Sequence, residues 1–189
     1  MILHRKIFYA VRHGQTHDNA AHVISGGGRD PDLTDFGREQ AQKAAQTFAL
    51  LSHVPTRIIA STLKRTHQTA SLIAPHIPHE IDARLNERYL GELDGLISEQ
   101  EQIKRGTLPG EENVADQAAR VIGALNDHLQ HDAVALFVAH GGTLRRILEA
   151  ANLKGKVEAH NAVIYGFAPE GTADWRVFAA SAEQKIISE

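Results

Sequence analysis

Residues 8–16 read Phe8-Tyr9-Ala10-Val11-Arg12-His13-Gly14-Gln15-Thr16. The apolar run that begins one residue earlier and stops at the arginine is typical of a buried strand. Two chemically active side chains and a glycine follow it directly. Because ligands in open α/β sheets bind outside the carboxyl ends of the strands, this stretch predicts both a first strand and a polar site at its end.

The rest of the chain alternates short apolar runs with helical patterns, which is typical of a sheet joined by crossover helices. The runs predict strands over residues 57–61, 79–82, 133–139, 162–167 and 175–179. The helical patterns predict helices over residues 35–51, 62–76, 114–129 and 143–151. An α/β fold follows from this alternation.

Local signals add detail to these helices. Thr34 and Asn113 are expected as N-caps of the helices that follow them, whose apolar stripes begin at Phe36 and Val114. Residues 84–110 have a weak pattern, with one short helix near residues 96–104. We expect this segment to form a lid over the strand ends.

Composition excludes several classes of protein. The 189 residues hold 20 Lys and Arg against 23 Asp and Glu, so the formal net charge of -3 argues against a protein that coats nucleic acid. The absence of cysteine excludes thiol nucleophiles, thiolate zinc sites and disulfides. No apolar run approaches the length of a membrane span. We expect one domain over residues 1–189, soluble and cytoplasmic, with no membrane partner; the sequence leaves the oligomeric state open.

Side chains suited to anions or to proton transfer follow three of the expected strands. Arg12 and His13 follow the first, Arg65 comes shortly after the second, and His140 follows the strand over residues 133–139. Two of these strand ends continue into glycine, and one of them enters a helix, whose N-terminus favours negative charge. Since guanidinium groups pair bidentately with phosphate oxygens, the group predicts a phosphoryl site.

At this point the sequence resembles the histidine phosphatase superfamily, in its phosphoglycerate-mutase-like branch. Residues 8–16 resemble the signature of that family, and further matches follow in the same order along most of the chain. They are Asn19; Asp32-Leu33-Thr34 with Gly37 and Gln40-Ala41; Ser61-Thr62-Leu63-Lys64-Arg65-Thr66-His67-Gln68-Thr69-Ala70; Leu85-Asn86-Glu87-Arg88 with Gly91, Asp94 and Gly95; Pro109-Gly110-Glu111-Glu112; and Val138-Ala139-His140-Gly141-Gly142-Thr143-Leu144-Arg145. The resemblance sharpens the expected fold to a three-layer α/β/α sandwich with a mixed, mainly parallel central sheet.

The resemblance also implies roles for individual residues. His13 would be the nucleophile and become a phosphohistidine, Glu87 would be the proton donor, and Arg12, Arg65 and His140 would hold the phosphoryl oxygens. A histidine attacks only as the neutral imidazole, so its second nitrogen should donate to a backbone carbonyl. These residues supply the positive charge themselves, so no metal or other cofactor is expected.

Four further residues are candidates for binding the substrate. Asn19 would lie near the phosphate, with a turn-forming role as an equal alternative. Thr16 would line the pocket or only shape its loop, Gly141 would offer its backbone, and Arg88 could reach a second anion.

The expected activity is hydrolysis of a small phosphorylated metabolite. Two alternatives stay open: phosphoryl transfer of the phosphoglycerate-mutase type, and a protein that binds a phosphorylated ligand without turnover. Residues 87–139 hold four Lys and Arg against ten Asp and Glu, a poor clamp for a bisphosphate. This balance favours a substrate whose non-phosphate part is neutral, cationic or apolar.

Overall fold

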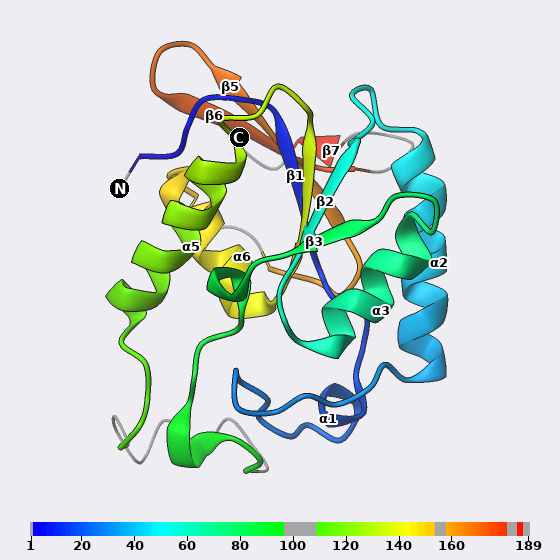
Figure 1. Ribbon diagram of the computed structural model, residues 1–189, viewed down its shortest axis with the longest axis vertical. Helices are drawn as coiled ribbons and strands as arrows, with labels where there is room; N and C mark the ends of the chain where they lie inside the picture. The colour runs from blue at the N-terminus through cyan, green and yellow to red at the C-terminus, as the bar shows by residue number, and fades with distance from the viewer. Residues whose placement is uncertain (1, 97–108, 154–157, 181–184, 187–189) are drawn as a thin grey trace.

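A mixed β-sheet forms the centre of the molecule (Figure 1). The computed structural model describes residues 2–96, 109–153, 158–180 and 185–186. Within them the sheet has seven strands in the order β3-β2-β4-β1-β5-β6-β7. Their bounds are β1 (Phe8–Arg12), β2 (Arg57–Ala60), β3 (His79–Ile81), β4 (Ala135–Ala139), β5 (Ile164–Glu170), β6 (Asp174–Ala179) and β7 (Lys185–Ile186).

The first four strands in this order pair in parallel, and the last three continue the sheet by antiparallel pairing. In the parallel half, helices connect successive strands, as parallel pairing requires. The parallel arrangement brings the carboxyl ends of β1, β2 and β4 to the same edge of the sheet. This is the edge at which the sequence placed the polar residues.

The helices form a layer on each face of the sheet. They are α1 (His17–Ala20), α2 (Asp35–Ala49), α3 (Lys64–Ile73), α5 (Val114–His128) and α6 (Gly141–Ala150), with short 3₁₀ turns η1 (Ala83–Leu85) and η2 (Gly91–Leu93). In Figure 1, α2 and α3 cover one face and α5 and α6 the other. The expected three-layer α/β/α sandwich is therefore confirmed.

The side chains of β1 pack into the hydrophobic core on both faces of the sheet. Phe8 and Ala10 pack in the core beneath α5 and α6, while Tyr9 and Val11 pack in the core beneath α2 and α3. Successive side chains of a strand point to opposite faces, so an unbroken apolar run fits a strand that is covered on both sides. On the first face the ring of Phe8 stacks on Phe167 with centroids 4.6 Å apart.

Both predicted N-caps are confirmed, but two positions of the predicted apolar stripes are wrong. Thr34 accepts a hydrogen bond from the Gly37 amide, and Asn113 accepts one from the Ala115 amide. Phe36 and Val114, by contrast, are 52% and 44% exposed. Each lies in the first turn of its helix, where periodicity alone does not show whether another element covers the turn.

Some expected boundaries shift as well. Helix α3 is shorter than residues 62–76 because its chain leaves the helix at Ala74, before Pro75. Strand β7 had no sequence signal. The expected short helix near residues 96–104 falls almost entirely outside the described residues, so the lid over residues 84–110 stays a prediction. Within the described ranges, no helix is both long enough and apolar enough to cross a membrane.

Candidate active site

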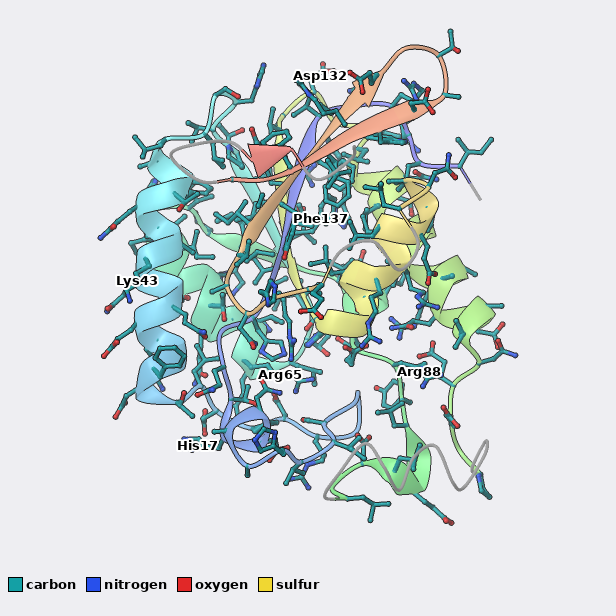
Figure 2. The ribbon with its side chains drawn as sticks, turned by 180° about the vertical axis from the view of Figure 1, so that it is seen from behind. His17, Lys43, Arg65, Arg88, Asp132 and Phe137 are labelled. Atoms are coloured by element: carbon teal, nitrogen blue, oxygen red, sulfur yellow. The ribbon has the colours of Figure 1, made fainter. Side chains whose placement is uncertain are left out.

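A cavity of about 1040 Å³ opens at the carboxyl ends of β1 and β4. Six of the predicted site residues line it: Arg12, His13, Asn19, Glu87, Arg88 and Gly141. Figure 2 shows Arg65 and Arg88 at this end of the molecule, whereas Asp132, which precedes β4, lies at the opposite end.

The His13 ring is held in one tautomer. Its Nδ1 lies 2.8 Å from the carbonyl oxygen of Gly14, so Nδ1–H donates and Nε2 keeps a free lone pair. Burial lowers the pKa of His13 well below its ordinary value, and the charges of Arg65 and Arg12 lower it further. At neutral pH the ring is therefore the uncharged form that a nucleophile needs.

The backbone around His13 is itself anchored by side chains. The Gly14 amide donates to Oγ1 of Thr69 at 3.0 Å, and Nδ2 of Asn161 donates to the His13 carbonyl at 2.8 Å. These bonds attach the loop after β1 to α3 and to the segment before β5. The position of the imidazole thus depends on residues far apart in the sequence.

His140 lies beside His13, with ring centroids 5.3 Å apart, and is fully buried. Its Nδ1 accepts a hydrogen bond from Nε of Arg65 at 3.3 Å, and its Nε2 lies 2.8 Å from Oγ of Ser61. Burial lowers the pKa of His140 well below its ordinary value, and the charge of Arg65 acts in the same direction. The ring is thus neutral, with Nε2–H donating to the serine.

Arg65 is the largest fully buried side chain in the described residues. Besides its bond to His140, the guanidinium donates to the carbonyls of Arg29 at 2.6 Å and Gly26 at 3.2 Å. It does not line the cavity directly, but lies behind the pair of histidines. Two segments far from α3 in sequence therefore orient this arginine.

Arg12 lines the cavity, and one of its buried donors has no partner among the described residues. One of its terminal nitrogens donates to the Ala159 carbonyl at 3.0 Å, whereas its buried Nε finds no acceptor among the described residues. A buried N–H without a partner is costly.

The carboxylate of Glu87 is held by three N–H donors. The Arg88 amide (2.8 Å) and Nε2 of Gln117 (3.1 Å) donate to Oε1, and the Gly142 amide (2.7 Å) donates to Oε2. The last donor belongs to the first turn of α6, where backbone amides have no partner within the helix. A side chain at Gly142 would collide with this carboxylate.

Gln117 was missed by the sequence analysis. It is buried on the inner face of α5, between the apolar positions Val114 and Val121. A glutamine at a core-facing position of an amphipathic helix was a usable signal, because buried amides require partners. Ser61 was part of the family pattern and was assigned to the end of a strand, but it was given no role in the site. Asn161 was missed, because a single polar residue in a short loop gives no such signal.

The remaining candidate residues differ in whether they reach the cavity. Thr16 and Asn19 cap α1 through a reciprocal pair of 3.2 Å bonds; Thr16 is fully buried, while Asn19 also reaches the cavity. Arg88 reaches the cavity as well, and forms an ion pair with Glu111 at 2.9 Å. The described part of the chain holds no group of three or more residues suited to a metal ion.

A family model and several known proteins match this chain in sequence. A model of the histidine phosphatase superfamily (branch 1) matches residues 8–166. The chain is 28% identical over 174 residues to a broad-specificity phosphatase of Saccharomyces cerevisiae, covering 83% of this chain and 74% of the yeast protein. It is 37% identical over 150 residues to a probable phosphoglycerate mutase of Enterobacter sp., covering 70% of this chain and 68% of that protein.

Solved structures show the same fold. A mycobacterial glucosyl-3-phosphoglycerate phosphatase, in complex with VO3, superposes with a TM-score of 0.79 at 24% identity, over 92% of this chain and 98% of that one. The product of an open reading frame of Mycobacterium tuberculosis superposes with a TM-score of 0.80 at 26% identity, over 94% and 97% of the two chains. The α/β architecture is therefore shared with proteins of low sequence identity.

Proposed function

Because the chain belongs to the histidine phosphatase superfamily (branch 1), we propose that it is a phosphomonoesterase that forms a phosphohistidine on His13 without a metal ion. The observation that carries this proposal is the 2.8 Å contact between Nδ1 of His13 and the Gly14 carbonyl. It leaves the Nε2 lone pair free in a cavity that also holds Arg12 and Glu87.

In the first step, Nε2 of His13 attacks the phosphorus atom and the bond from phosphorus to the ester oxygen breaks. Arg12 would bind the phosphoryl oxygens, and the buried charge of Arg65 would stabilise them from behind the two histidines. Direct contact of Arg65 or His140 with the phosphoryl group would require them to exchange their hydrogen bonds to Gly26, Arg29 and Ser61. The departing alkoxide takes a proton from Glu87, which must enter this step protonated. The alcohol then leaves, and the phosphoryl group stays on His13.

In the second step, water attacks the same phosphorus atom. Glu87, now a carboxylate, accepts the proton of the water, and the bond from phosphorus to Nε2 breaks. Inorganic phosphate leaves, His13 returns to the neutral imidazole, and Glu87 is again protonated. The three N–H donors around Glu87 keep its carboxylate at one place through both steps.

The test is phosphate release in excess chelator from p-nitrophenyl phosphate and a panel of sugar phosphates, nucleotides and phosphoglycerates. We expect chelator-resistant release by the natural protein, an acid-labile phosphoprotein on rapid quenching, and loss of both in His13→Ala. His53→Ala, an exposed position, is the matched control. Release that persists in His13→Ala would refute the phosphohistidine.

A mutase remains the second candidate, since a relative that is 37% identical is named as a probable phosphoglycerate mutase. The two activities differ in where the phosphoryl group goes. Phosphate kept on an organic product, with little release to water, would establish the mutase. Tight binding of phosphate esters with no turnover of any of them would establish a binding protein instead.

A further inference from the structure

Two peptide units follow His13, and side chains from other elements hold both of them. The first unit joins His13 to Gly14, and the second joins Gly14 to Gln15. The carbonyl of the second unit is the one that lies 2.8 Å from Nδ1 of His13. Because a peptide unit is planar, a partner bound to its N–H also fixes the direction of its carbonyl oxygen. The tautomer of His13 therefore depends on what holds these two planes.

Gln40 of α2 holds the second peptide unit. The Gln15 amide donates a hydrogen bond to Oε1 of Gln40 at 2.9 Å. In a trans peptide unit the N–H and the carbonyl point in opposite directions, so Gln40 and the His13 ring bind the same plane from opposite sides. Gln40 is half-buried and is not among the residues that line the cavity. It can thus orient the Gly14 carbonyl without touching a substrate.

Two further side chains hold the first peptide unit. Its N–H, that of Gly14, donates to Oγ1 of Thr69 at 3.0 Å. Its carbonyl, that of His13, accepts from Nδ2 of Asn161 at 2.8 Å. The backbone of this asparagine is fixed in turn, since the amide of the next residue donates to the Arg12 carbonyl at 2.9 Å. Both polar groups of the first unit are therefore bound from outside the loop.

Gly14 needs these partners because it does not restrict its own backbone. Glycine lacks the side chain that limits rotation in other residues. A larger residue does not fit, since a Cβ at Gly14 would run into the carbonyl of Gly37 on α2. The residue whose carbonyl faces the His13 ring is thus the one with the most conformational freedom, and neighbouring elements must supply the rigidity.

We propose that Gln40, together with Thr69 and Asn161, is a positioning residue that sets the tautomer of His13. This rests on the proposed function, in which Nε2 of His13 attacks phosphorus. While the two planes are held, the Gly14 carbonyl accepts from Nδ1–H and the lone pair stays on Nε2. Without Gln40 the carbonyl turns away, the proton moves through water from Nδ1 to Nε2, and the protonated Nε2 has no lone pair for the attack.

The direction of each hydrogen bond predicts opposite results for the same chemical change. Gln40 accepts through an oxygen atom, so Gln40→Glu keeps the acceptor. Asn161 donates through a nitrogen atom, so Asn161→Asp places an oxygen against the His13 carbonyl. Both substitutions preserve the size and shape of the side chain, so a role in packing alone predicts no difference between them.

Steady-state hydrolysis of p-nitrophenyl phosphate gives the first test. In Gln40→Leu, kcat should fall by about 10-fold or more while KM stays within a few-fold, because the side chain acts only through the backbone. Gln40→Glu should stay within a few-fold of the natural protein. Asn161→Asp should lose about 10-fold or more in kcat, and so should Asn161→Leu, which removes the donor without adding a charge.

Asn126→Leu is the matched control. The Asn126 amide also donates to a backbone carbonyl, that of Ile2 at 2.9 Å, but Asn126 is not among the cavity residues. This variant should change neither kcat nor KM. An unchanged kcat in Gln40→Leu, or equal rates in Gln40→Glu and Asn161→Asp, would overturn the proposal.

The tautomer itself is measured by NMR of protein labelled with nitrogen-15 histidine, which needs no substrate. The His13 signals are those that disappear in His13→Ala. At neutral pH the natural protein and Gln40→Glu should carry the ring proton on Nδ1. Gln40→Leu and Asn161→Asp should show a second population with the proton on Nε2. A proton that stays on Nδ1 in both of these variants would refute the positioning role.

The two measurements separate this proposal from the proposed function. A tautomer that depends on Gln40, in a protein that turns over no ester, refutes only the hydrolysis. Turnover that depends on His13, with a tautomer that is indifferent to Gln40, refutes only the positioning. If Gln40→Leu does not fold, Gln40→Glu and Asn161→Asp give the same decision, since they preserve the shape of the side chain.

Discussion

Two adjacent glycines at the start of α6 differ in what a side chain would meet. A Cβ at Gly142 would run into the Glu87 carboxylate, which the Gly142 amide binds. A Cβ at Gly141 would lie 3.5 Å from Nε of Arg12, an ordinary contact. The close approach of Glu87 to the helix backbone therefore depends on one glycine and not on its neighbour.

This difference predicts a contrast between two substitutions. Gly142→Ala should displace Glu87 and lower kcat on the order of 100-fold, because small misplacements of a catalytic group cost rates of that size. Gly141→Ala should stay within a few-fold of the natural protein. Steady-state hydrolysis of p-nitrophenyl phosphate measures both, with thermal unfolding to show that each variant is folded. Equal rates in the two variants would contradict this account of Glu87.

At the scale of the element, α5 does more than cover the sheet. Its inner face is apolar except for Gln117, whose amide donates to Glu87 across to the site. The helix thereby links the packing of the core to the position of Glu87, the proposed proton donor.

Replacing this amide should affect catalysis more than folding. In Gln117→Leu, a change of similar size, Glu87 loses one of its three donors and kcat should fall by about 10-fold, while KM stays within a few-fold. Gln130→Leu, at an exposed position after α5, is the matched control. An unchanged kcat in Gln117→Leu would show that the other two donors suffice.

The N-cap of α5 should affect stability and leave catalysis unchanged. Asn113 accepts a hydrogen bond from the Ala115 amide at 2.7 Å. Asn113→Ala should lower the free energy of unfolding by about 1 kcal/mol, and Asn113→Asp should restore it. Urea denaturation measures the change, and kcat should not move, since the side chain does not touch the site.

At the scale of the whole molecule, the buried site should make stability depend on pH. His13 and His140 have a lowered pKa in the folded protein because they are buried beside arginines. The unfolded chain takes up protons on both near the ordinary value of 6.5, so acid favours unfolding. Stability is therefore greatest above that value and is lost as the pH falls below it.

Urea denaturation in phosphate-free buffer between about pH 7.5 and 5 should show this loss. Each histidine adds up to about 1.4 kcal/mol per pH unit to the slope. Carboxylates with a lowered pKa, such as Asp18 and Asp82, act only at lower pH. His140→Gln should reduce the slope by one histidine's share; an unchanged slope would mean that His140 is protonated in the folded state.

Apart from the short elements α1 and β7, the order of strands and helices was determined by the sequence itself, as were both N-caps and the chemical types at the strand ends. These features depend on neighbours within a few residues: unbroken apolar runs for strands covered on both faces, a 3.6-residue period for helices, and a side-chain oxygen before the first turn. The same local pattern placed Phe36 and Val114 in the core wrongly, because exposure depends on what lies across from a helix turn.

Only the tertiary structure decided how the site is assembled and charged. The serine that holds His140 and the glutamine that holds Glu87 belong to segments brought together by folding, and so do Thr69 and Asn161, which anchor the backbone around His13. The charge of the cavity wall was decided there too, because among the described lining residues there are four arginines and one carboxylate, while Glu112 and Asp127 pair with arginines outside the cavity. The net charge of a segment is the sum over all its residues, but a bound ligand interacts mainly with the charged groups that line its cavity. The reason is that Coulomb energies fall with distance and with screening by the solvent.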